Sequence, residues 1–329
     1  MKIFITGIAG FLGSHLADAL IAEGHTVSGC DNLMGGYIDN VPDEASFFQI
    51  DCSFLSTMKN LLKGIDVVYH TACTAYEGLS VFSPHKICQN TFQNTVTTLT
   101  AAIANNVEHF VYCSSMSRYG TQEIPFTEDM EPKPQDPYAI AKVASENVIK
   151  NLCEVHGMKY TIAVPHNIIG PRQKYDDPFR NVAAIMINMM LQGKQPIIYG
   201  NGKQKRCFSY IDDCIGSLLK LPHHTGIFNI GPDEEFVTIN TLAEIIADEL
   251  NFNLMPTYVL GRPMEVELCN CSAEKARREL GYETKTTLRD GLREMIKYIK
   301  DKGPKKFRYH LDIEIQNERT PETWTKRLF

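Results

Sequence analysis

The residues best suited to chemistry are a tyrosine and a lysine four positions apart, Tyr138 and Lys142. On a helix, positions i and i+4 lie on one face, so the lysine ammonium would lie beside the phenol. An adjacent opposite charge favours the ionised form and typically lowers a pKa by about one to three units. The pair therefore predicts a general base at Tyr138. Ser115, earlier in the chain, could hydrogen-bond a substrate hydroxyl that is being oxidised.

Three glycines at a spacing of three form the second chemical signal. Gly7, Gly10 and Gly13 follow an apolar run, residues 2–6, and open a helical pattern. Glycine lets the backbone turn tightly and approach a diphosphate, whose charge then meets the first N–H groups of the helix. Asp31 ends the next expected strand, where a carboxylate accepts hydrogen bonds from both ribose hydroxyls and repels a 2′-phosphate. The order of these features predicts a dinucleotide site that favours NAD over NADP.

Bulk properties are those of an ordinary globular enzyme. The chain has 329 residues, is 43% hydrophobic and 22% charged, and carries a net charge of −6, which gives no electrostatic support to nucleic-acid or membrane-surface binding. No apolar run approaches the length of a membrane span, and the amino end passes directly into the first expected strand, so no signal peptide is expected. The ten cysteines are scattered, with Cys269 and Cys271 the nearest pair, which predicts buried thiols in a reducing cytoplasm and no metal site.

Six strands alternate with helices up to residue 165, which predicts an α/β fold with a doubly wound parallel sheet. General rules give such a sheet right-handed crossovers and the strand order 3-2-1-4-5-6. The expected strands are residues 2–6, 25–30, 45–50, 66–71, 110–114 and 160–165. The expected helices begin near residues 11, 55, 93 and 137, and residues 72–84 are expected to form a loop. The last helix has Pro137 in its first turn and Gly157 as its cap.

The pattern loosens after residue 165, and we expect two interleaved domains. Residues 1–165 would bind the dinucleotide, and residues 166–329 would form a smaller α/β substrate domain over the carboxyl edge of the sheet. Its expected elements are helices at 181–192, 212–221, 241–250 and 272–280 and short strands at 195–199, 208–211 and 227–230. A charged tail from residue 303 holds the only tryptophan, Trp324. The sequence leaves open whether this tail packs on a neighbour or frays.

Taken together, these segments resemble the extended short-chain dehydrogenase/reductases of the nucleotide-sugar epimerase/dehydratase family, of the UDP-glucose 4-epimerase kind. The resemblance covers nearly the whole chain, up to about residue 283. Besides Asp31-Asn32 and His70-Thr71-Ala72, the matching pieces read TGIAGFLG, CSSMSRYG, PYAIAK, HNIIGPRQ, IIYGNGKQKRCFSYIDD and GRPMEVELCNCSAEKARRELGYE.

The resemblance implies a role for each matched position. The catalytic trio would be Ser115, Tyr138 and Lys142. NAD would be bound by Gly7, Gly10, Phe11, Leu12, Gly13, Asp31, Asn32, Asp51, Cys52, Ala72, Asn90, Tyr138, Lys142, Pro165 and His166. The nucleotide sugar would be bound by Ser115, Met116, Asn167, Tyr199, Arg206 and Arg262, the two arginines holding its diphosphate. His70 is expected to be packed and hydrogen-bonded, and Asp212-Asp213 to mark the start of a helix.

The two residues after Ser115 favour one reaction over the others of the family. Dehydratases carry an Asp-Glu pair there, and decarboxylases usually keep the glutamate, whereas this chain has Met116 and Ser117. Neither side chain transfers protons at carbon, so oxidation and reduction at C4 remain, which is epimerisation of a UDP-hexose, UDP-N-acetylhexosamine or UDP-hexuronate. Dehydration, decarboxylation or net oxidation stays as one alternative, and a non-catalytic NAD-binding regulator as another.

The resemblance also implies a homodimer through a four-helix bundle of residues 93–106 and 137–156 from each subunit. Several positions depart from the family pattern: Arg118, Cys207 and Glu265, the last two each in place of an aspartate, Asn94 in place of a glycine, and the segment 74–83. Arg118 stands where a small apolar residue is usual, so we expect it either to contact a carboxylate or acetamido group of the sugar or to be exposed.

Overall fold

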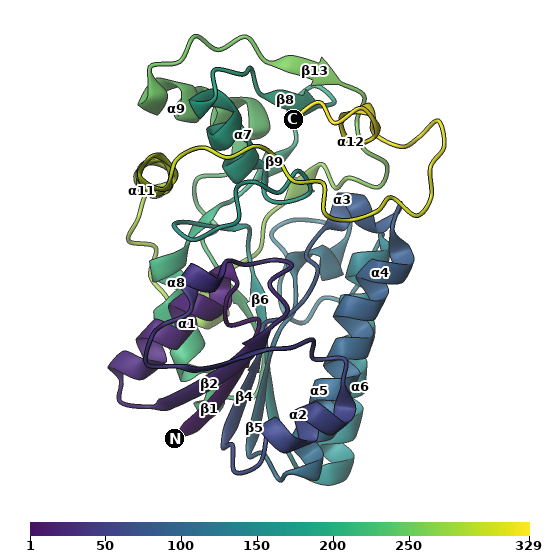
Figure 1. The fold of residues 1–329 in the computed structure, drawn as a ribbon, viewed down its shortest axis with the longest axis vertical. Coiled ribbons are helices and arrows are strands. Elements are labelled where there is room, and N and C mark those ends of the chain that lie inside the picture. The colour runs from purple at the N-terminus through teal and green to yellow at the C-terminus, as the bar shows by residue number, and fades with distance from the viewer.

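The computed structural model describes residues 1–329 and is built on a seven-stranded, fully parallel sheet (Figure 1). Across the sheet the strands are β11 (Gly226–Ile230), β6 (Lys159–Pro165), β5 (His109–Cys113), β4 (Val67–His70), β1 (Lys2–Thr6), β2 (Thr26–Asp31) and β3 (Ser46–Gln49). The first six strands follow the predicted order 3-2-1-4-5-6, which confirms the doubly wound α/β fold. The seventh, β11, comes from the second half of the chain and pairs with β6.

Two helical layers cover the sheet because its strands are apolar on both faces. Side chains of β1 alternate: Ile3 and Ile5 belong to one buried cluster and Phe4 to the other. The first cluster lies under α1 (Phe11–Ala22), α8 (Ile211–Lys220) and α10 (Glu274–Leu280). The second lies under α2 (Leu55–Leu61), α5 (Asn94–Ala104) and α6 (Pro137–His156). Both layers are visible on either side of the strands in Figure 1.

Helix α6 begins and ends where its sequence signals predict. Asp136 is the N-cap, and its side chain accepts a hydrogen bond from the Ala139 N–H at 2.9 Å. Pro137 stands in the first turn, and Gly157 ends the helix in the left-handed conformation with φ of 71°. These caps fix the helix that carries Tyr138 and Lys142.

The helix predicted to begin near residue 93 begins earlier. A helical run starts with α4 (Pro84–Cys88), passes through a π-helical turn (Gln89–Gln93) and continues as α5. A further short helix, α3 (Glu77–Ser80), lies in a segment that the sequence predicts to be a loop. Pro84 in the first turn of α4 is the signal that could have placed this start.

The second half of the chain forms a smaller lobe at the carboxyl ends of the strands. Its core packs α7 (Val182–Leu191), α9 (Ile239–Leu250) and α11 (Leu288–Lys302), and the last of these was not predicted. Its short strands are β7 (Ile168–Ile169), β8 (Ile197–Tyr199), β9 (Lys205–Arg206), β10 (Ser209–Tyr210), β12 (Val237–Thr238), β13 (Thr257–Val259) and β14 (Leu268–Cys269). The second half of the chain does not lie wholly in this lobe, because its elements β11, α8 and α10 belong to the sheet and its helical layers.

The tail, residues 303–329, packs back on the same chain and ends with α12 (Glu322–Thr325). It runs in yellow from α11 across the smaller lobe in Figure 1 and reaches the region of α3 and α4. All ten cysteines are free, and no three or more His, Cys, Asp or Glu side chains gather as a metal site would require. None of the helices combines the length and apolar character that crossing a bilayer requires.

Candidate active site

A cavity of about 220 Å³ lies at the carboxyl ends of the central strands, and we call it the glycine-turn cavity. Fourteen of the fifteen residues predicted to bind a dinucleotide line it. They are Gly7, Gly10, Phe11, Leu12, Gly13, Asp31, Asn32, Asp51, Cys52, Ala72, Asn90, Tyr138, Lys142 and Pro165. The fifteenth, His166, is fully buried elsewhere.

The glycine turn between β1 and α1 has the geometry that a diphosphate needs. Gly7 has a φ of +78°, which a residue with a side chain rarely adopts. A Cβ on Gly13 would lie 2.2 Å from the carbonyl oxygen of Gly7, so only glycine allows this closeness of turn and helix. The amino end of α1 therefore opens into the cavity with its first N–H groups free to meet an anion.

Asp31 stands at the end of β2 on one wall of the cavity. Its carboxylate accepts hydrogen bonds from the backbone N–H groups of Ala9 at 3.2 Å and Leu33 at 2.7 Å. Burial raises the pKa of this carboxyl, and the two N–H donors oppose that rise. These bonds fix the carboxylate at the position where the sequence predicts a ribose acceptor.

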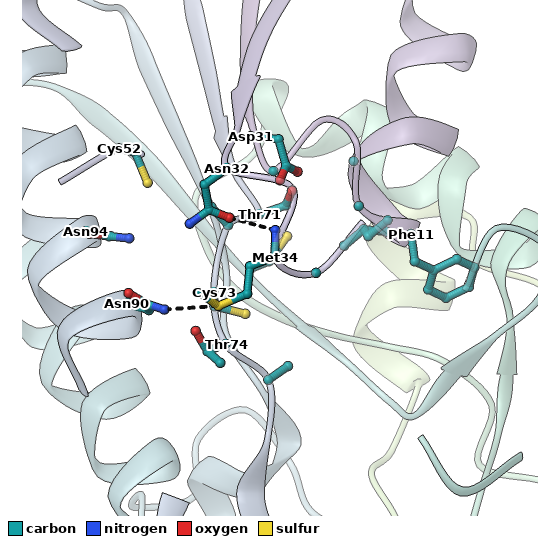
Figure 2. Close-up of a pocket in the computed structure, with 18 of the residues that line it drawn as sticks. Phe11, Asp31, Asn32, Met34, Cys52, Thr71, Cys73, Thr74, Asn90 and Asn94 are labelled. Atoms are coloured by element: carbon teal, nitrogen blue, oxygen red, sulfur yellow. Dashed lines mark hydrogen bonds between the residues drawn. The ribbon is translucent and has the colours of Figure 1, made fainter. Parts of the chain in front are cut away.

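The far end of the glycine-turn cavity is polar on both sides. Asn32 donates to a carboxylate oxygen of Asp51 at 2.8 Å. Figure 2 shows Asp31 and Asn32 on one wall and the helix-borne Asn90 opposite, with Met34 between them. The amide of Asn90 lies 3.6 Å from the sulfur of Met34. The residues present thus fit a bound dinucleotide: a phosphate turn at the centre, a ribose-binding carboxylate and an apolar–polar channel for the bases.

Tyr138 and Lys142 lie at the inner end of this cavity. The phenol ring is 4% exposed and the lysine 1% exposed. The lysine ammonium donates to the carbonyl of Cys113 at 2.5 Å and lies 5.8 Å from the centre of the Tyr138 ring. This bond to the end of β5 fixes the ammonium on the face of α6 that carries the phenol.

The prediction of a lowered pKa for Tyr138 is wrong for the chain by itself. Burial raises the pKa of its phenol well above the usual range, while the Lys142 ammonium opposes the rise. The pKa of Lys142 is also raised: burial opposes the rise, and neighbouring thiol and phenol groups, Cys73 and Tyr112 first among them, favour it. The spacing of Tyr138 and Lys142 predicts the ammonium that lowers the pKa of the phenol. The burial of the ring, which raises that pKa, depends on packing by distant residues that the spacing does not show.

A second cavity of about 340 Å³ adjoins the first and reaches into the smaller lobe; we call it the arginine cavity. All six residues predicted to bind the sugar nucleotide line it: Ser115, Met116, Asn167, Tyr199, Arg206 and Arg262. Tyr138 lines both cavities, as do Ser114 and Pro165. The phenol is therefore in the wall shared by the two spaces.

The two arginines are held by neighbours on the wall of the arginine cavity. Arg262 pairs with Glu265 at 2.9 Å, and its guanidinium lies 4.8 Å from the centre of the Tyr199 ring. Arg206 lies 3.9 Å from the same carboxylate and donates to backbone carbonyls, including that of Val266. Guanidinium groups match phosphate oxygens, so the two arginines on this wall fit the diphosphate-binding role that the sequence predicts.

Three polar residues are buried and paired within the protein: Arg118, His166 and His70. Arg118 is 1% exposed and pairs with the equally buried Glu146 at 3.0 Å, so it neither contacts the sugar cavity nor faces solvent as expected. His166 is predicted to stack in the cofactor site but lines neither cavity, since its ring is turned toward the carbonyl of Pro232. His70 is packed as expected, with its ring nitrogens 2.8 Å from Thr6 Oγ1 and 3.0 Å from Thr95 Oγ1.

Two smaller sequence expectations have different structural outcomes. Asp212 and Asp213 lie in the first turn of α8 without capping it, and Asp213 instead accepts from the N–H groups of Lys285 and Thr286. Cys207, the departure from the family aspartate, is buried and faces the carbonyl of Glu234.

Sequence reasoning missed Arg180, which lines both cavities. Its guanidinium donates to the carbonyl of Gly35 at 3.0 Å, lies 3.4 Å from Asp177 and stacks 5.0 Å from the centre of the Tyr76 ring. Tyr76 in turn donates to Asp177. No motif surrounds Arg180, so only the fold could have brought it to the site.

Glu77 is the second missed residue, and it lies in the segment that the sequence predicts to be a loop. It lines the arginine cavity and is exposed to solvent. Burial and the neighbouring Asp136 carboxylate raise its pKa, and Arg206 and Arg262 oppose that rise. Glu77 therefore brings a carboxyl group to this cavity, whereas the two residues after Ser115, Met116 and Ser117, have none.

Comparison with known proteins identifies the family of this chain. Residues 3–231 match the model of the NAD dependent epimerase/dehydratase family. The crystal structure of UDP-glucose 4-epimerase from Thermotoga maritima with UDP-glucose is 30% identical, with a TM-score of 0.87, over 92% of this chain and 99% of that one.

Two further proteins show the breadth of the reactions. The crystal structure of UDP-glucuronic acid 4-epimerase from Bacillus cereus, in complex with UDP-glucuronic acid and NAD, is 28% identical with a TM-score of 0.86, over 92% of this chain and 100% of that one. UDP-N-acetyl-alpha-D-glucosaminuronate decarboxylase of Bacillus cytotoxicus is 31% identical over 71% of this chain and 76% of its own length. With its parallel sheet, its glycine turn and its Tyr-Lys pair between two cavities, this chain belongs to the NAD-dependent epimerase/dehydratase family.

Proposed function

We propose that this protein is an NAD-dependent nucleotide-sugar 4-epimerase acting on a UDP-sugar. The observation that carries the proposal is the place of Tyr138 in the wall between the glycine-turn cavity and the arginine cavity. A base in that wall can reach a sugar hydroxyl on one side of the site while the nicotinamide lies on the other. The likeness to two solved UDP-sugar 4-epimerases supports the same reaction and cofactor.

The residues divide the work between proton transfer and binding. NAD, when bound, accepts a hydride from C4 and returns it. Tyr138, as the phenolate that the Lys142 ammonium favours, takes the proton of the C4 hydroxyl and becomes the neutral phenol. Ser115 hydrogen-bonds the same hydroxyl. The oxidised sugar turns about its diphosphate, which Arg206 and Arg262 hold, so that the opposite face receives the hydride.

The cavity wall beside Ser115 supports epimerisation over water or carbon dioxide loss. Met116 and Ser117 follow the serine, and the side chain of Met116 is buried with no proton to transfer. Glu77 is the observation that favours a second candidate, a dehydratase or decarboxylase. Its carboxyl faces the arginine cavity with a raised pKa, so it could act as an acid.

Proton NMR of the reaction decides between these functions. We expect the purified protein, loaded with NAD, to interconvert C4 epimers of UDP-glucose, UDP-N-acetylglucosamine or UDP-glucuronate without added oxidant. Loss of water or carbon dioxide, or a stoichiometric build-up of NADH, would instead identify the second candidate or a net dehydrogenase. Failure to convert any of these sugars, to its C4 epimer or to any other product, would favour a non-catalytic NAD-binding regulator.

We also propose that the two halves of the chain bind different ligands and that the protein works in a reducing compartment. Residues 1–165 would bind NAD and residues 166–329 the nucleotide sugar, with β11, α8 and α10 of the second part packed into the first. The ten free thiols favour the cytoplasm as the compartment.

A homodimer through α5 and α6 is the proposed assembly. On α6, Ile140 is 52% exposed and Val155 is 68% exposed, which leaves apolar side chains at both ends of the helix for a partner to cover. We expect light scattering to give twice the mass of the chain, and Ile140→Glu to shift the mass toward a monomer. A single-chain mass for the unaltered protein would contradict the bundle.

A further inference from the structure

The tail, residues 303–329, is tied down along its length to both lobes. On the smaller lobe, Lys305 and Asn188 exchange two hydrogen bonds, from the Lys305 N–H at 3.0 Å and to its carbonyl at 2.8 Å. On the sheet side, the Glu314 carboxylate accepts from the N–H groups of His85 and Lys86 at the start of α4, both at 2.9 Å. The tail therefore crosses from α7 to α4 (Figure 1), over the region between the two lobes.

The end of the tail forms part of the wall of the arginine cavity. Trp324 and Phe329 both line this cavity, although they are only 4% and 8% exposed. The indole packs edge-on against Phe179, with ring centres 5.5 Å apart, and against Phe82 at 6.0 Å. These contacts hold an aromatic wall in a fixed orientation.

The tail joins the cavity beside the arginine pair. The hydroxyls of Thr323 and Tyr199 are 2.5 Å apart, and the same Tyr199 ring lies under the Arg262 guanidinium. If the arginines hold the diphosphate, the sugar extends from them toward Tyr138 and the nucleoside extends the other way. We take the aromatic wall of the tail to be on the nucleoside side, because Thr323 of the tail meets Tyr199, which packs on Arg262.

The indole N–H of Trp324 is buried and has no acceptor among the protein atoms. Buried donors are nearly always paired, so an unpaired one beside a binding cavity points to an acceptor that a ligand supplies. A pyrimidine base carries carbonyl oxygens of this kind. The solved relatives are matched almost end to end by 92% of this chain, and the remainder is about as long as the tail.

We propose that the tail completes the nucleotide end of the substrate site, with Trp324 packing against the base and its N–H meeting a base carbonyl. This inference rests on the proposed function, because it takes a nucleoside diphosphate to occupy the arginine cavity. It adds a determinant of base affinity on the tail.

Trp324 is the only tryptophan in the chain, so it reports on its own site. We expect titration of the NAD-loaded protein with UDP to change the tryptophan emission, with a midpoint equal to the dissociation constant from calorimetry. Trp324→Ala should weaken UDP binding by about tenfold or more, and Trp324→Phe, which keeps a ring and loses the N–H, by about three- to tenfold. Glu318→Ala, an exposed change on the same tail, should leave binding unchanged.

The outcomes separate the two proposals. UDP binding seen by calorimetry without any change in Trp324 emission, or with folded Trp324 variants binding within twofold of the unaltered protein, would overturn the role of the tail alone. A protein that binds no UDP, GDP, CDP or dTDP would overturn the proposed function and the role of the tail together. The emission titration uses the unaltered chain, so it stands even where a Trp324 variant fails to fold.

Discussion

Replacing Tyr138 with phenylalanine is expected to lower kcat by about 10²- to 10⁴-fold, the usual contribution of a positioned general base. The substitution removes one oxygen from a ring that is 4% exposed and keeps the ring itself. Folding and NAD content should therefore stay close to those of the unaltered protein. The measurement is the rate of C4 epimer formation by NMR, with the bound NAD determined on the same sample.

The pH dependence of kcat is expected to report the titration of Tyr138. Burial raises the pKa of this phenol and Lys142 lowers it, so activity needs deprotonation and should rise with pH up to the apparent pKa. Lys142→Met removes the opposing charge and should move the acid limb of the profile to higher pH. A Tyr138→Phe protein with unaltered kcat, or a Lys142→Met profile that does not move, would remove the phenol from the mechanism.

Breaking the Arg118–Glu146 pair is expected to give the largest loss of stability. Both side chains are 1% exposed, and the Glu146 carboxylate also accepts a hydrogen bond from Ser114. Removing one partner leaves an uncompensated buried charge, which costs about 3–5 kcal/mol. We therefore expect Arg118→Met to lower the free energy of unfolding by that amount in urea titrations.

The double variant Arg118→Met/Glu146→Leu is the matched control. Replacing both charges with apolar groups is often neutral or stabilising, so most of the loss should be recovered. An Arg118→Met variant as stable as the unaltered protein would show that the ion pair contributes little to the free energy of unfolding. Because Ser114 lies at the end of β5 and lines both cavities, the single variant should also lower activity where it remains folded.

The sheet and the glycine-turn cavity could be predicted because their signals are local. A glycine spacing, an acid at a strand end and a capped helix each depend on a few neighbouring residues, and the fold brings fourteen of the fifteen predicted cofactor residues to one cavity. His166 was the exception. It follows β6 directly, but the turn after the strand directs its ring toward Pro232.

The features that the sequence did not predict depend on contacts between residues on different elements. Arg180 reaches the site only because Tyr76 and Asp177 hold it, and these three residues share no local pattern. Arg118 looked like a pocket residue because its partner, Glu146, lies on another element. The tail showed no strong periodicity, and its packing depends on Phe82 and Phe179, far away in sequence.

One guanidinium, that of Arg180, faces both the glycine-turn cavity and the arginine cavity. Its carboxylate partner Asp177 is fully buried, whereas the Arg180 side chain keeps 19% of its surface exposed, so the same guanidinium meets whatever occupies either space. An anion bound on one side changes the field that an anion on the other side meets, which makes the two affinities thermodynamically linked. Reciprocity then requires that NAD alter the dissociation constant of the sugar nucleotide by the same factor as the sugar nucleotide alters that of NAD.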